Sequence, residues 1–454
     1  MHYKTQSLVC SFCLTVAYCL ACEDDDDVNP PSTLPDSGNP DRDASSAGGS
    51  SGGNGGNDAS VAGASGTGGL DGSVTDSGGA DADADTDASP RDGGVCPVDD
   101  GMCIFRHETF GDEQLWTDTL GLHEVVQTLT PTAALGVGLK VDADAVPADV
   151  LAGADLTVAE TTLALLTLNA VVGVRATVED GQITQIGITC ALCHSTVDDS
   201  VAAGIGSRLD GWPNRDLDPG AIIAMTPGVS ALADQLGVTT AAAVATLNSW
   251  GPGRYDARFN QDGESFPVLI PPAYGLAEVE LETYTGEGPV SYWNAYVAVT
   301  QMGAQGSFHD EDLGLDIVAD PDLVTPRLAA LRDYQFSLNP PVPPAGSFDE
   351  TASERGDLLF EDNCASCHVK DTSYTDAPLL HDPAEVGTDA NEARRSKTGQ
   401  YRTTPLRGAW SHPPYFHDGS AATFDDVVDH YDALLGLGFT GQEQMDLAEY
   451  LKSL

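Results

Sequence analysis

The sequence predicts a mainly α-helical protein of two domains, preceded by a disordered N-terminal segment, with one β-hairpin in an enlarged first domain. Three observations predict this. Residues 23–93 are rich in Gly, Ser and Asp and hold almost no large apolar side chains. Two Cys-x-x-Cys-His motifs, at residues 190–194 and 364–368, lie on either side of a proline-rich segment at 338–344. With 454 residues, the chain is long enough for two domains and a tail.

Residues 1–22 have the pattern of a secretory signal. Lys4 precedes an apolar run from Leu8 to Ala21, which is too short for a membrane-spanning helix with these flanks. The run ends at Cys22, directly before Glu23 and four aspartates, and resembles a bacterial lipoprotein signal, although Cys19 stands where leucine is usual. We therefore expect lipidation at Cys22 and export to the periplasm or the outer membrane. Ordinary cleavage to a soluble protein is the alternative.

Residues 23–93 carry sixteen acidic residues and two arginines. This composition cannot bury enough apolar surface to offset the entropy of ordering, so we expect a disordered tether, extended by charge repulsion. The whole chain has 70 acidic and 20 basic residues. This balance argues against nucleic acid and against anionic membrane surfaces, and leaves the lipid anchor as the expected membrane contact. The excess of negative charge would attract a basic redox partner protein. The alternative is that this charge serves only solubility.

The first domain is expected over residues 94–340. Cys96 and Cys103 open it, and in an exported protein they predict a disulfide rather than a redox or metal site. The apolar spacing predicts helices over 110–126, 161–172 and 291–301. Between them, residues 173–188 alternate in the manner of strands around Asp180-Gly181, which predicts a hairpin that leads into the first Cys-x-x-Cys-His motif.

The second domain is expected over residues 347–454, after the stiff proline linker. Ala352, Gly356, Leu359 and Phe360 share one face of a helix that runs into Cys364. A final helix begins at a capping box formed by Thr440 and Glu443, and its apolar stripe is Leu447, Leu451 and Leu454. We expect these two helices to cross, with Gly356 allowing a close approach.

The Cys-x-x-Cys-His spacing predicts covalent c-type haem. The two cysteines can form thioethers with the two vinyl groups of one haem, and the histidine then lies beneath the iron. The cofactor ligands are thus Cys190, Cys193 and proximal His194, and Cys364, Cys367 and proximal His368. A thioredoxin-like pair or a zinc site is the alternative, which two such motifs in an exported chain disfavour. Calcium is compatible with the sequence but not indicated by it.

The sixth ligand of each iron separates electron transfer from catalysis, because a filled position favours electron transfer. For the first haem, Met302 is the leading candidate, and core packing is its commoner role. Its rivals are Met225, His107, His123 and His309. For the second haem, the candidates are Tyr431, His430, His417 and Met445, the last of which we expect to belong to the core.

Basic residues are scarce, yet five of them lie within fourteen residues: Arg394, Arg395, Lys397, Arg402 and Arg407. Two haems bring four propionates. Arg402 and Arg407 are candidate partners for these carboxylates. A solvated basic patch that docks a partner is the alternative.

Three stretches of the C-terminal region carry a family resemblance: Tyr401–Gly408 (YRTTPLRG), Pro414–Ser420 (PYFHDGS) and Thr423–Tyr431 (TFDDVVDHY). Residues 350–454 are similar to the C-terminal haem domain of the bacterial dihaem cytochrome c peroxidases and of the related dihaem enzymes of methylamine utilisation. The resemblance implies two cytochrome-c-like domains, one passing electrons and one meeting peroxide. It also implies Tyr431 as the distal ligand of the second haem and His417 as a neighbour of that haem.

Residues 94–340 depart from this family pattern, since the distal-pocket residues of the peroxidases have no obvious counterpart there. The sequence therefore predicts a dihaem electron carrier first. A peroxidase-like enzyme that reduces hydrogen peroxide is the second hypothesis. A third is an enzyme that oxidises a protein partner, suggested by Tyr431. No catalytic residue is assigned.

Overall fold

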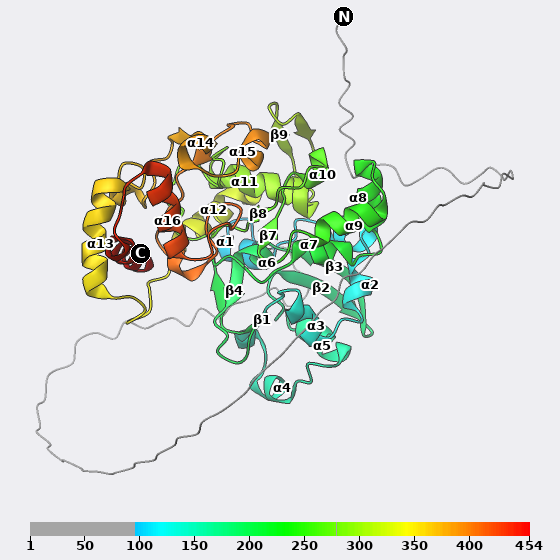
Figure 1. Cartoon of the computed structure of the whole chain (residues 1–454). Coiled ribbons are helices and arrows are strands. Elements are labelled where there is room, and N and C mark those ends of the chain that lie inside the picture. Colours follow the sequence, from blue (N-terminus) through cyan, green and yellow to red (C-terminus); the bar gives the residue numbers. More distant parts are fainter. Residues whose placement is uncertain (1–95, 278) are drawn as a thin grey trace, which may run out of the picture. The chain divides into compact units, whose positions relative to one another are not determined.

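The computed structural model describes residues 96–277 and 279–454. The predicted signal at 1–22, the lipidation site Cys22 and the tether at 23–93 lie outside the described residues. Most of the regular secondary structure in the described chain is helical, and the strands form small two-stranded sheets (Figure 1). The fold is therefore mainly α, as predicted.

The N-terminal part, residues 96–337, holds a series of short helices and strand pairs. Its helices are α1 (Gly101–His107), the π-helix η1 (Gln114–Thr119), α2 (Leu122–Val126), α3 (Pro131–Gly136), η2 (Ala143–Ala145), α4 (Ala148–Gly153), α5 (Ala159–Thr167), α6 (Ala191–His194), α7 (Pro219–Ala224), α8 (Val229–Leu236), α9 (Thr240–Asn248), α10 (Phe259–Asp262), α11 (Val290–Val297), the π-helix η3 (Ala298–Met302), η4 (Thr325–Arg327) and α12 (Leu328–Ser337). Its strands are β1 (Val141–Asp142), β2 (Val174–Glu179), β3 (Gln182–Ile188), β4 (Ser195–Val197), β5 (Ile205–Gly206), β6 (Arg208–Asp210), β7 (Arg254–Tyr255), β8 (Val268–Leu269), β9 (Phe308–Asp310) and β10 (Leu315–Ile317).

The predicted hairpin is confirmed. Strands β2 and β3 pair antiparallel, with Val174 opposite Ile188 and Glu179 opposite Gln182. Asp180 and Gly181 both have positive φ, 50° and 78°, which a two-residue turn of this kind requires. The predicted helix at 291–301 is also present, as α11 continued by η3 up to Met302.

Two other helix predictions were wrong in extent. The stretch 110–126 is not one helix, because Gly121 adopts a left-handed conformation (φ 70°) and separates η1 from α2. Helix α5 ends at Thr167, before the predicted end at 172. Beyond it, Asn169 takes a positive φ of 55° and Val171 forms a bridge with Val141.

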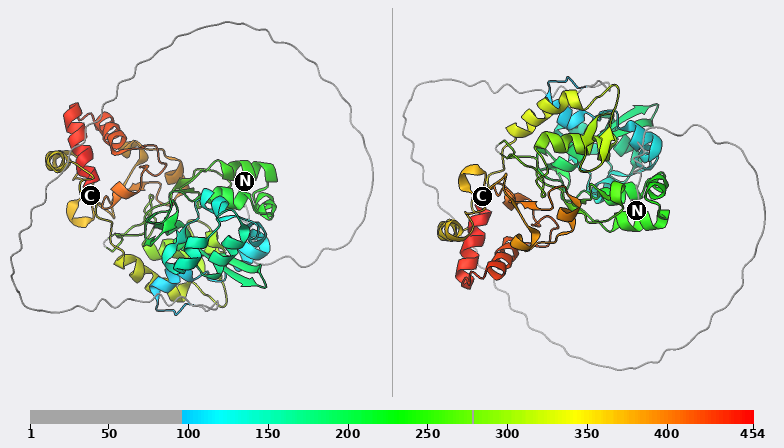
Figure 2. Two further views of the ribbon diagram at one scale, coloured as in Figure 1. Left: turned by 90° about the horizontal axis from the view of Figure 1, so that it is seen from below. Right: turned by 90° about the horizontal axis from the view of Figure 1, so that it is seen from above.

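The C-terminal part, residues 350–454, contains α13 (Glu350–Asn363), η5 (Lys370–Thr372), β11 (Leu380–His381), α14 (Pro383–Val386), α15 (Asn391–Arg395), β12 (Tyr401–Arg402), η6 (Ala409–Ser411), α16 (Phe424–Leu435) and α17 (Gly441–Lys452). Helices α13 and α17 lie side by side, the first yellow and the second red in Figures 1 and 2. A Cβ atom on Gly356 would lie 2.1 Å from the backbone oxygen of Asp446, so glycine is needed at this crossing. The capping box of Thr440 and Glu443 is present at the start of α17.

Each hydrophobic cluster of the described residues lies wholly before or wholly after the proline segment at 338–344. The C-terminal cluster joins Phe360 of α13, Phe424 and Val428 of α16, and Leu447 and Leu451 of α17. The division into two haem domains stays a prediction. Among the described residues, no helix has the length and apolar character needed to span a bilayer.

Candidate haem sites

The first Cys-x-x-Cys-His motif directly follows the hairpin. Strand β3 ends at Ile188, Cys190 begins the short helix α6, and His194 ends it. A Cβ atom on Gly173, where the hairpin starts, would lie 2.0 Å from the backbone nitrogen of Leu192, so the hairpin packs directly on the motif. The amides of Gly211 and Asn214 donate to the carbonyls of His194 and Cys193, at 2.8 and 2.9 Å. The motif is thus held between two segments of backbone.

His194 has the orientation of an iron ligand. Its Nδ1 lies 3.1 Å from the carbonyl oxygen of Pro271, which can only accept a hydrogen bond, so Nδ1 carries the proton and Nε2 keeps its lone pair. Burial lowers the pKa of His194 to about 4 and keeps the imidazole neutral, as a metal ligand must be. Burial also raises the pKa of Cys190 and of Cys193 to about 12.

A large cavity adjoins this motif, and Cys190, Cys193 and His194 form part of its wall. Most of the remaining wall is apolar and comes from the hairpin, from α7, from β8 and from α11 with η3. A c-type haem needs two thiols, a neutral imidazole and an apolar enclosure, and the residues present supply all three.

The structure brings two of the five predicted distal ligands to this cavity. Met302 is buried and lines it, and Met225 lines it while 43% exposed. His107, His123 and His309 are not among the residues that line it. Met302 as the distal ligand stays a prediction, and its backbone oxygen accepts a hydrogen bond from the Trp116 indole at 3.0 Å.

Sequence reasoning missed several polar residues of this cavity, among them Tyr255 and Gln301. The Tyr255 hydroxyl donates to Oε1 of Gln301 at 3.0 Å. Burial raises the pKa of Tyr255, and the nearby Cys193 adds to the rise. No motif marks Tyr255 in the sequence, because its position depends on the pairing of β7 with β8.

The second motif lies at the end of α13, with Cys364 as the residue after the last turn. His368 repeats the arrangement of His194, since its Nδ1 lies 2.9 Å from the carbonyl oxygen of Tyr374. Burial lowers the pKa of His368. The ring of Phe360 lies 6.2 Å from the imidazole and encloses it on one side.

Tyr431 lies close to the second pair of thiols. Burial raises the pKa of Tyr431 to about 12, with smaller contributions from Cys364 and Cys367. The rival His430 is engaged elsewhere, with Nε2 3.0 Å from the carbonyl oxygen of Val386. Met445 is 52% exposed, so the expectation that it belongs to the core was wrong: it projects from the outer side of α17.

His417 is buried and lies toward the N-terminal part. Its Nε2 is 3.1 Å from the Tyr401 hydroxyl and its Nδ1 is 3.2 Å from the Thr388 hydroxyl. Its ring is 6.2 Å from Tyr284, which lines the cavity of the first motif. Burial lowers the pKa of His417.

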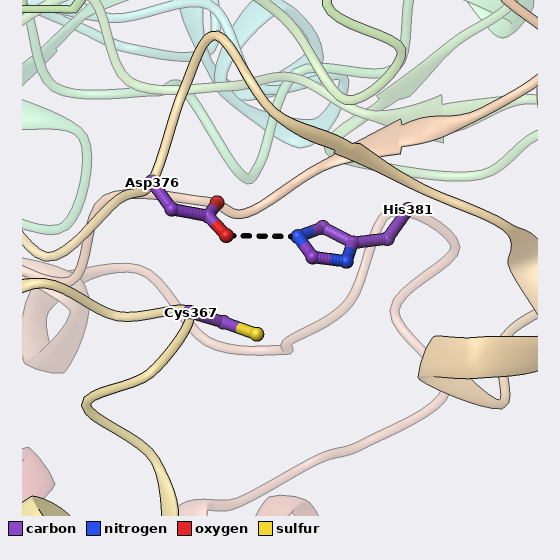
Figure 3. A group of neighbouring side chains, drawn as sticks. All are labelled: Cys367, Asp376 and His381. Carbon is purple, nitrogen blue, oxygen red and sulfur yellow. Dashed lines mark hydrogen bonds and ion pairs between the residues drawn. The ribbon is translucent and has the colours of Figure 1, made fainter.

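Three other side chains meet beside the second motif: Cys367, Asp376 and His381 (Figure 3). One potential ligand atom from each lies within 4.8 Å of the others. Nε2 of His381 is 3.0 Å from Asp376, and its Nδ1 is 3.2 Å from Glu385. Because the motif assigns the Cys367 sulfur to a thioether, we interpret this group as the polar surroundings of the second haem site.

The basic cluster is solvated only in part, because Arg394 and Arg407 are exposed while other members form ion pairs inside the molecule. Arg395 is buried and binds Asp256 with both terminal nitrogens at 3.0 Å, and Lys397 lies 3.0 Å from Asp310. Arg402 pairs with Glu282 at 3.1 Å. Arg407 is exposed, with its guanidinium 5.6 Å from the centre of the Tyr374 ring.

The sulfurs of Cys96 and Cys103 are joined by a disulfide of 2.01 Å, with the Cα atoms 5.7 Å apart. Both cysteines are buried in the hydrophobic cluster that also contains Met302. The pair therefore ties the start of the described chain to the core beside the first motif.

Known proteins resemble parts of this chain. The sequence is 26% identical over 205 residues to a protein of Sinorhizobium fredii described as the uncharacterized protein y4iM, and the match covers 34% of this chain and 42% of that protein. The chain thus spans about two fifths of the length of that relative. Among solved structures, it is similar to hydrazine synthase of Kuenenia stuttgartiensis (20% identity, 41% of this chain, 72% of that chain, TM-score 0.30). It is also similar to a MauG-like protein associated with microbial copper homeostasis (19% identity, 42% of this chain, 74% of that chain, TM-score 0.29).

A family model for cytochrome c matches residues 353–454. This range contains the second motif and nearly all of the two crossing helices. The resemblance inferred from residues 350–454 is confirmed at this level. The C-terminal part of the chain thus resembles a cytochrome c domain, and a domain of this kind implies a c-type haem.

Proposed function

We propose that this chain is an exported c-type cytochrome that carries two covalent haems and transfers electrons through them. The observation that carries the proposal is the matched geometry of the two motif histidines. In both, a backbone carbonyl binds Nδ1 and leaves Nε2 available as a ligand. A c-type haem at such a site supplies an iron that accepts and donates single electrons.

Aromatic contacts between the two motifs support electron transfer from one site to the other. Trp212 lies two residues from Asn214, whose amide binds the Cys193 carbonyl. The Trp212 ring is 6.0 Å from that of Trp410. Trp410 packs against the hydrophobic cluster that also contacts Cys364. Trp212 and Trp410 thus join the segment that holds the first motif to the cluster that contacts the second.

The test is a pyridine haemochrome assay on protein matured in a host that attaches c-type haem. We expect two haems per chain in the unaltered protein. Cys190→Ala/Cys193→Ala and Cys364→Ala/Cys367→Ala should each retain one. A potentiometric titration should then show two waves, of which each double variant lacks a different one. One haem per chain in the unaltered protein would contradict the proposal.

Export, lipid attachment at Cys22 and the tether at 23–93 belong to the same proposal and are supported by the sequence. Labelling with a radioactive fatty acid should mark the unaltered protein. Cys22→Ala should abolish the label and release the protein from the membrane fraction.

A peroxidase-like enzyme that reduces hydrogen peroxide is a second candidate. The observation that favours it is the cavity beside His194, where Tyr255 and Gln301 add polar groups to a mostly apolar wall. Peroxide should be added to half-reduced protein while the visible spectrum is recorded. A Soret shift near one equivalent would support the enzyme, and an unchanged spectrum with both haems intact would leave the electron carrier.

A further inference from the structure

Arg215 is a partly buried cation without a carboxylate partner among the described residues. Its Nη2 lies 3.3 Å from Nδ1 of His412, while its Nε and Nη1 are buried and make no hydrogen bond within residues 96–277 and 279–454. Burial lowers the pKa of His412 to about 3, and the charge of Arg215 adds to this, so the imidazole is neutral. The other groups that face the guanidinium are Tyr274 and Tyr284, together with a second cation, Arg254.

This arrangement is unexpected in so acidic a chain, which has 70 acidic and 20 basic residues. A buried guanidinium is normally paired with an anion, because desolvation of an unpaired charge is costly. The other buried arginines of this region follow the rule, since Arg258 pairs with Glu287 and Arg395 pairs with Asp256. Arg215 therefore points to an anion that is not a side chain of the described residues.

The neighbouring wall of the first cavity also holds buried polar atoms without a partner, of which the Thr283 hydroxyl can donate a hydrogen bond. Glu282, Thr283 and Tyr284 line the cavity that Cys190 and His194 also line. Within the described chain, Oε1 of Glu282 and Oγ1 of Thr283 are buried without a hydrogen-bond partner. Thr283 has a positive φ of 60°, which is uncommon for a β-branched residue and often marks a functional site.

Arg402 completes the group. Its Nη1 binds Glu282 at 3.1 Å and the carbonyl of Leu281 at 2.5 Å, but its buried Nε has no partner among the described residues. Both Arg215 and Arg402 act electrostatically on Tyr284. The unpaired donors therefore gather around one strip of the cavity wall, at residues 282–284.

We propose that Arg215, the Thr283 hydroxyl and Nε of Arg402 bind the propionate carboxylates of the haem attached at Cys190 and Cys193. This inference rests on the proposed function. Haem carries its two propionates on the edge away from the vinyl groups that bond the cysteines. A guanidinium presents a planar fork that fits a carboxylate with two parallel hydrogen bonds. The same carboxylates would satisfy each of the buried donors named above.

The test uses the full-length holoprotein and resonance Raman spectroscopy of the propionate bending bands. Arg215→Gln and Thr283→Val should each shift the bands of the first haem. Arg254→Gln is the matched control, because it removes a nearby positive charge whose hydrogen bond goes to the carbonyl of Asp418. We expect its bands to match the unaltered protein. The double variant Cys364→Ala/Cys367→Ala isolates the bands of the first haem.

A second readout is the pH dependence of the midpoint potential. With Arg215 in place, the propionates should stay ionised and the potential of the first haem should vary little between pH 5 and 8. In Arg215→Gln, a propionate should gain a proton on reduction, which gives a slope in that range. Arg215→Lys keeps the charge without the fork and should show shifted bands and a weaker slope.

If Arg215→Gln fails to fold, Arg215→Lys and Thr283→Val decide the question. Unchanged bands in both, or a shift confined to the second haem, would overturn the inference. A haemochrome assay on each variant separates this failure from that of the proposed function. One haem in the unaltered protein would reject the dihaem proposal, whereas two haems with unchanged bands would reject only the role of Arg215.

Discussion

Tyr431 is a partly buried tyrosine beside the thiols of the second motif. Burial raises its pKa to about 12, and Cys364 and Cys367 contribute to the rise. A distal tyrosine changes the ligand field of the iron, so Tyr431→Phe should change the visible spectrum of the second haem and shift its potential. The measurement is absorption spectroscopy of the variant that keeps only this haem, Cys190→Ala/Cys193→Ala.

The matched control is Tyr415→Phe. Tyr415 is a partly buried tyrosine of the C-terminal hydrophobic cluster, and its ring stacks on Phe424 at 4.3 Å. Its removal should leave the spectrum unchanged. Identical spectra for Tyr431→Phe and the unaltered protein would remove Tyr431 as the distal ligand.

Glu392 gives a pH dependence of stability. Burial raises its pKa to about 7, although the charges of Arg258 and Arg395 lower it, and Asp256 and Glu287 add to the rise. The folded state thus holds the proton more tightly than the unfolded state, where the pKa is 4.5. The contribution of Glu392 is fully present below pH 4.5 and is lost as the pH rises to about 7.

Glu392→Gln cannot titrate at this site. The free energy of unfolding of the variant, relative to the unaltered protein, should therefore rise by about 3 kcal/mol between pH 4 and pH 8. Urea unfolding at the two pH values measures this difference. Glu264→Gln is the control, because Glu264 pairs with Arg394 at the surface and exposed ion pairs contribute at most about 1 kcal/mol. A difference in unfolding free energy that falls or stays constant between pH 4 and pH 8 for Glu392→Gln would contradict a raised pKa of Glu392 in the folded state.

At the residue scale, the sequence predicts those residues whose spacing is set by covalent attachment to a porphyrin. These are Cys190, His194, Cys364 and His368. Tyr255 cannot be predicted in this way, because only the fold brings it to the cavity. The position of Arg215 was equally hidden. Charge alone cannot show that Nε and Nη1 of this arginine are buried and have no hydrogen-bond partner among the described residues.

At the element scale, the crossing of α13 and α17 depends on Gly356. A Cβ atom there would lie 2.1 Å from the Asp446 oxygen and 2.8 Å from Cβ of Tyr450, so the helices would have to separate. Overpacking of this kind typically costs about 1–3 kcal/mol. We expect Gly356→Ala to lower the free energy of unfolding by at least that amount, measured by denaturant unfolding of the holoprotein.

Gly441→Ala is the matched control for this change. Gly441 begins α17, has no atom within 4 Å of a built Cβ and does not have positive φ. Alanine at this position should be neutral or slightly stabilising, since it restricts the unfolded chain. Equal effects of the two substitutions would contradict a tight crossing at Gly356.

The elements that the sequence predicts well carry strong local signals. The Asp180-Gly181 turn and the Thr440–Glu443 capping box are examples, and both are present. The helix expected at 110–126 is interrupted because Gly121 takes a left-handed conformation, and apolar spacing does not reveal a local reversal of this kind. The short strand pairs depend on long-range contacts, such as β1 with β5, and no pattern in the sequence announces them.

At the scale of the whole molecule, polar contacts join the two parts of the chain. Arg395 and Lys397 bind carboxylates of the N-terminal part, and the Tyr274 hydroxyl donates to the carbonyl of Gly408 at 2.9 Å. The predicted partner-docking patch is therefore largely used inside the molecule. What remains at the surface is dominated by acids.

The formal net charge of −50 should govern the kinetics of electron exchange. Charged surfaces raise the local concentration of oppositely charged reactants, and salt screens this effect over about 10 Å at 0.1 M ionic strength. We expect reduced protein to react faster with a cationic ruthenium ammine than with ferricyanide at low salt, after correction for driving force. Stopped-flow absorption measures both rates.

The two reagents should respond to salt in opposite directions. The rate with the cation should fall between 0.01 and 0.5 M salt, because screening removes the attraction, and the rate with the anion should rise as repulsion is removed. A chain lacking residues 23–93 is the control, since it keeps all of the acidic residues of the folded part. With this shortened chain, the two rates should change with salt in the same directions as in the full chain, but by smaller amounts. Equal salt dependence for the two reagents would mean that the acidic surface lies away from the point of electron exchange, and that the charge serves solubility alone.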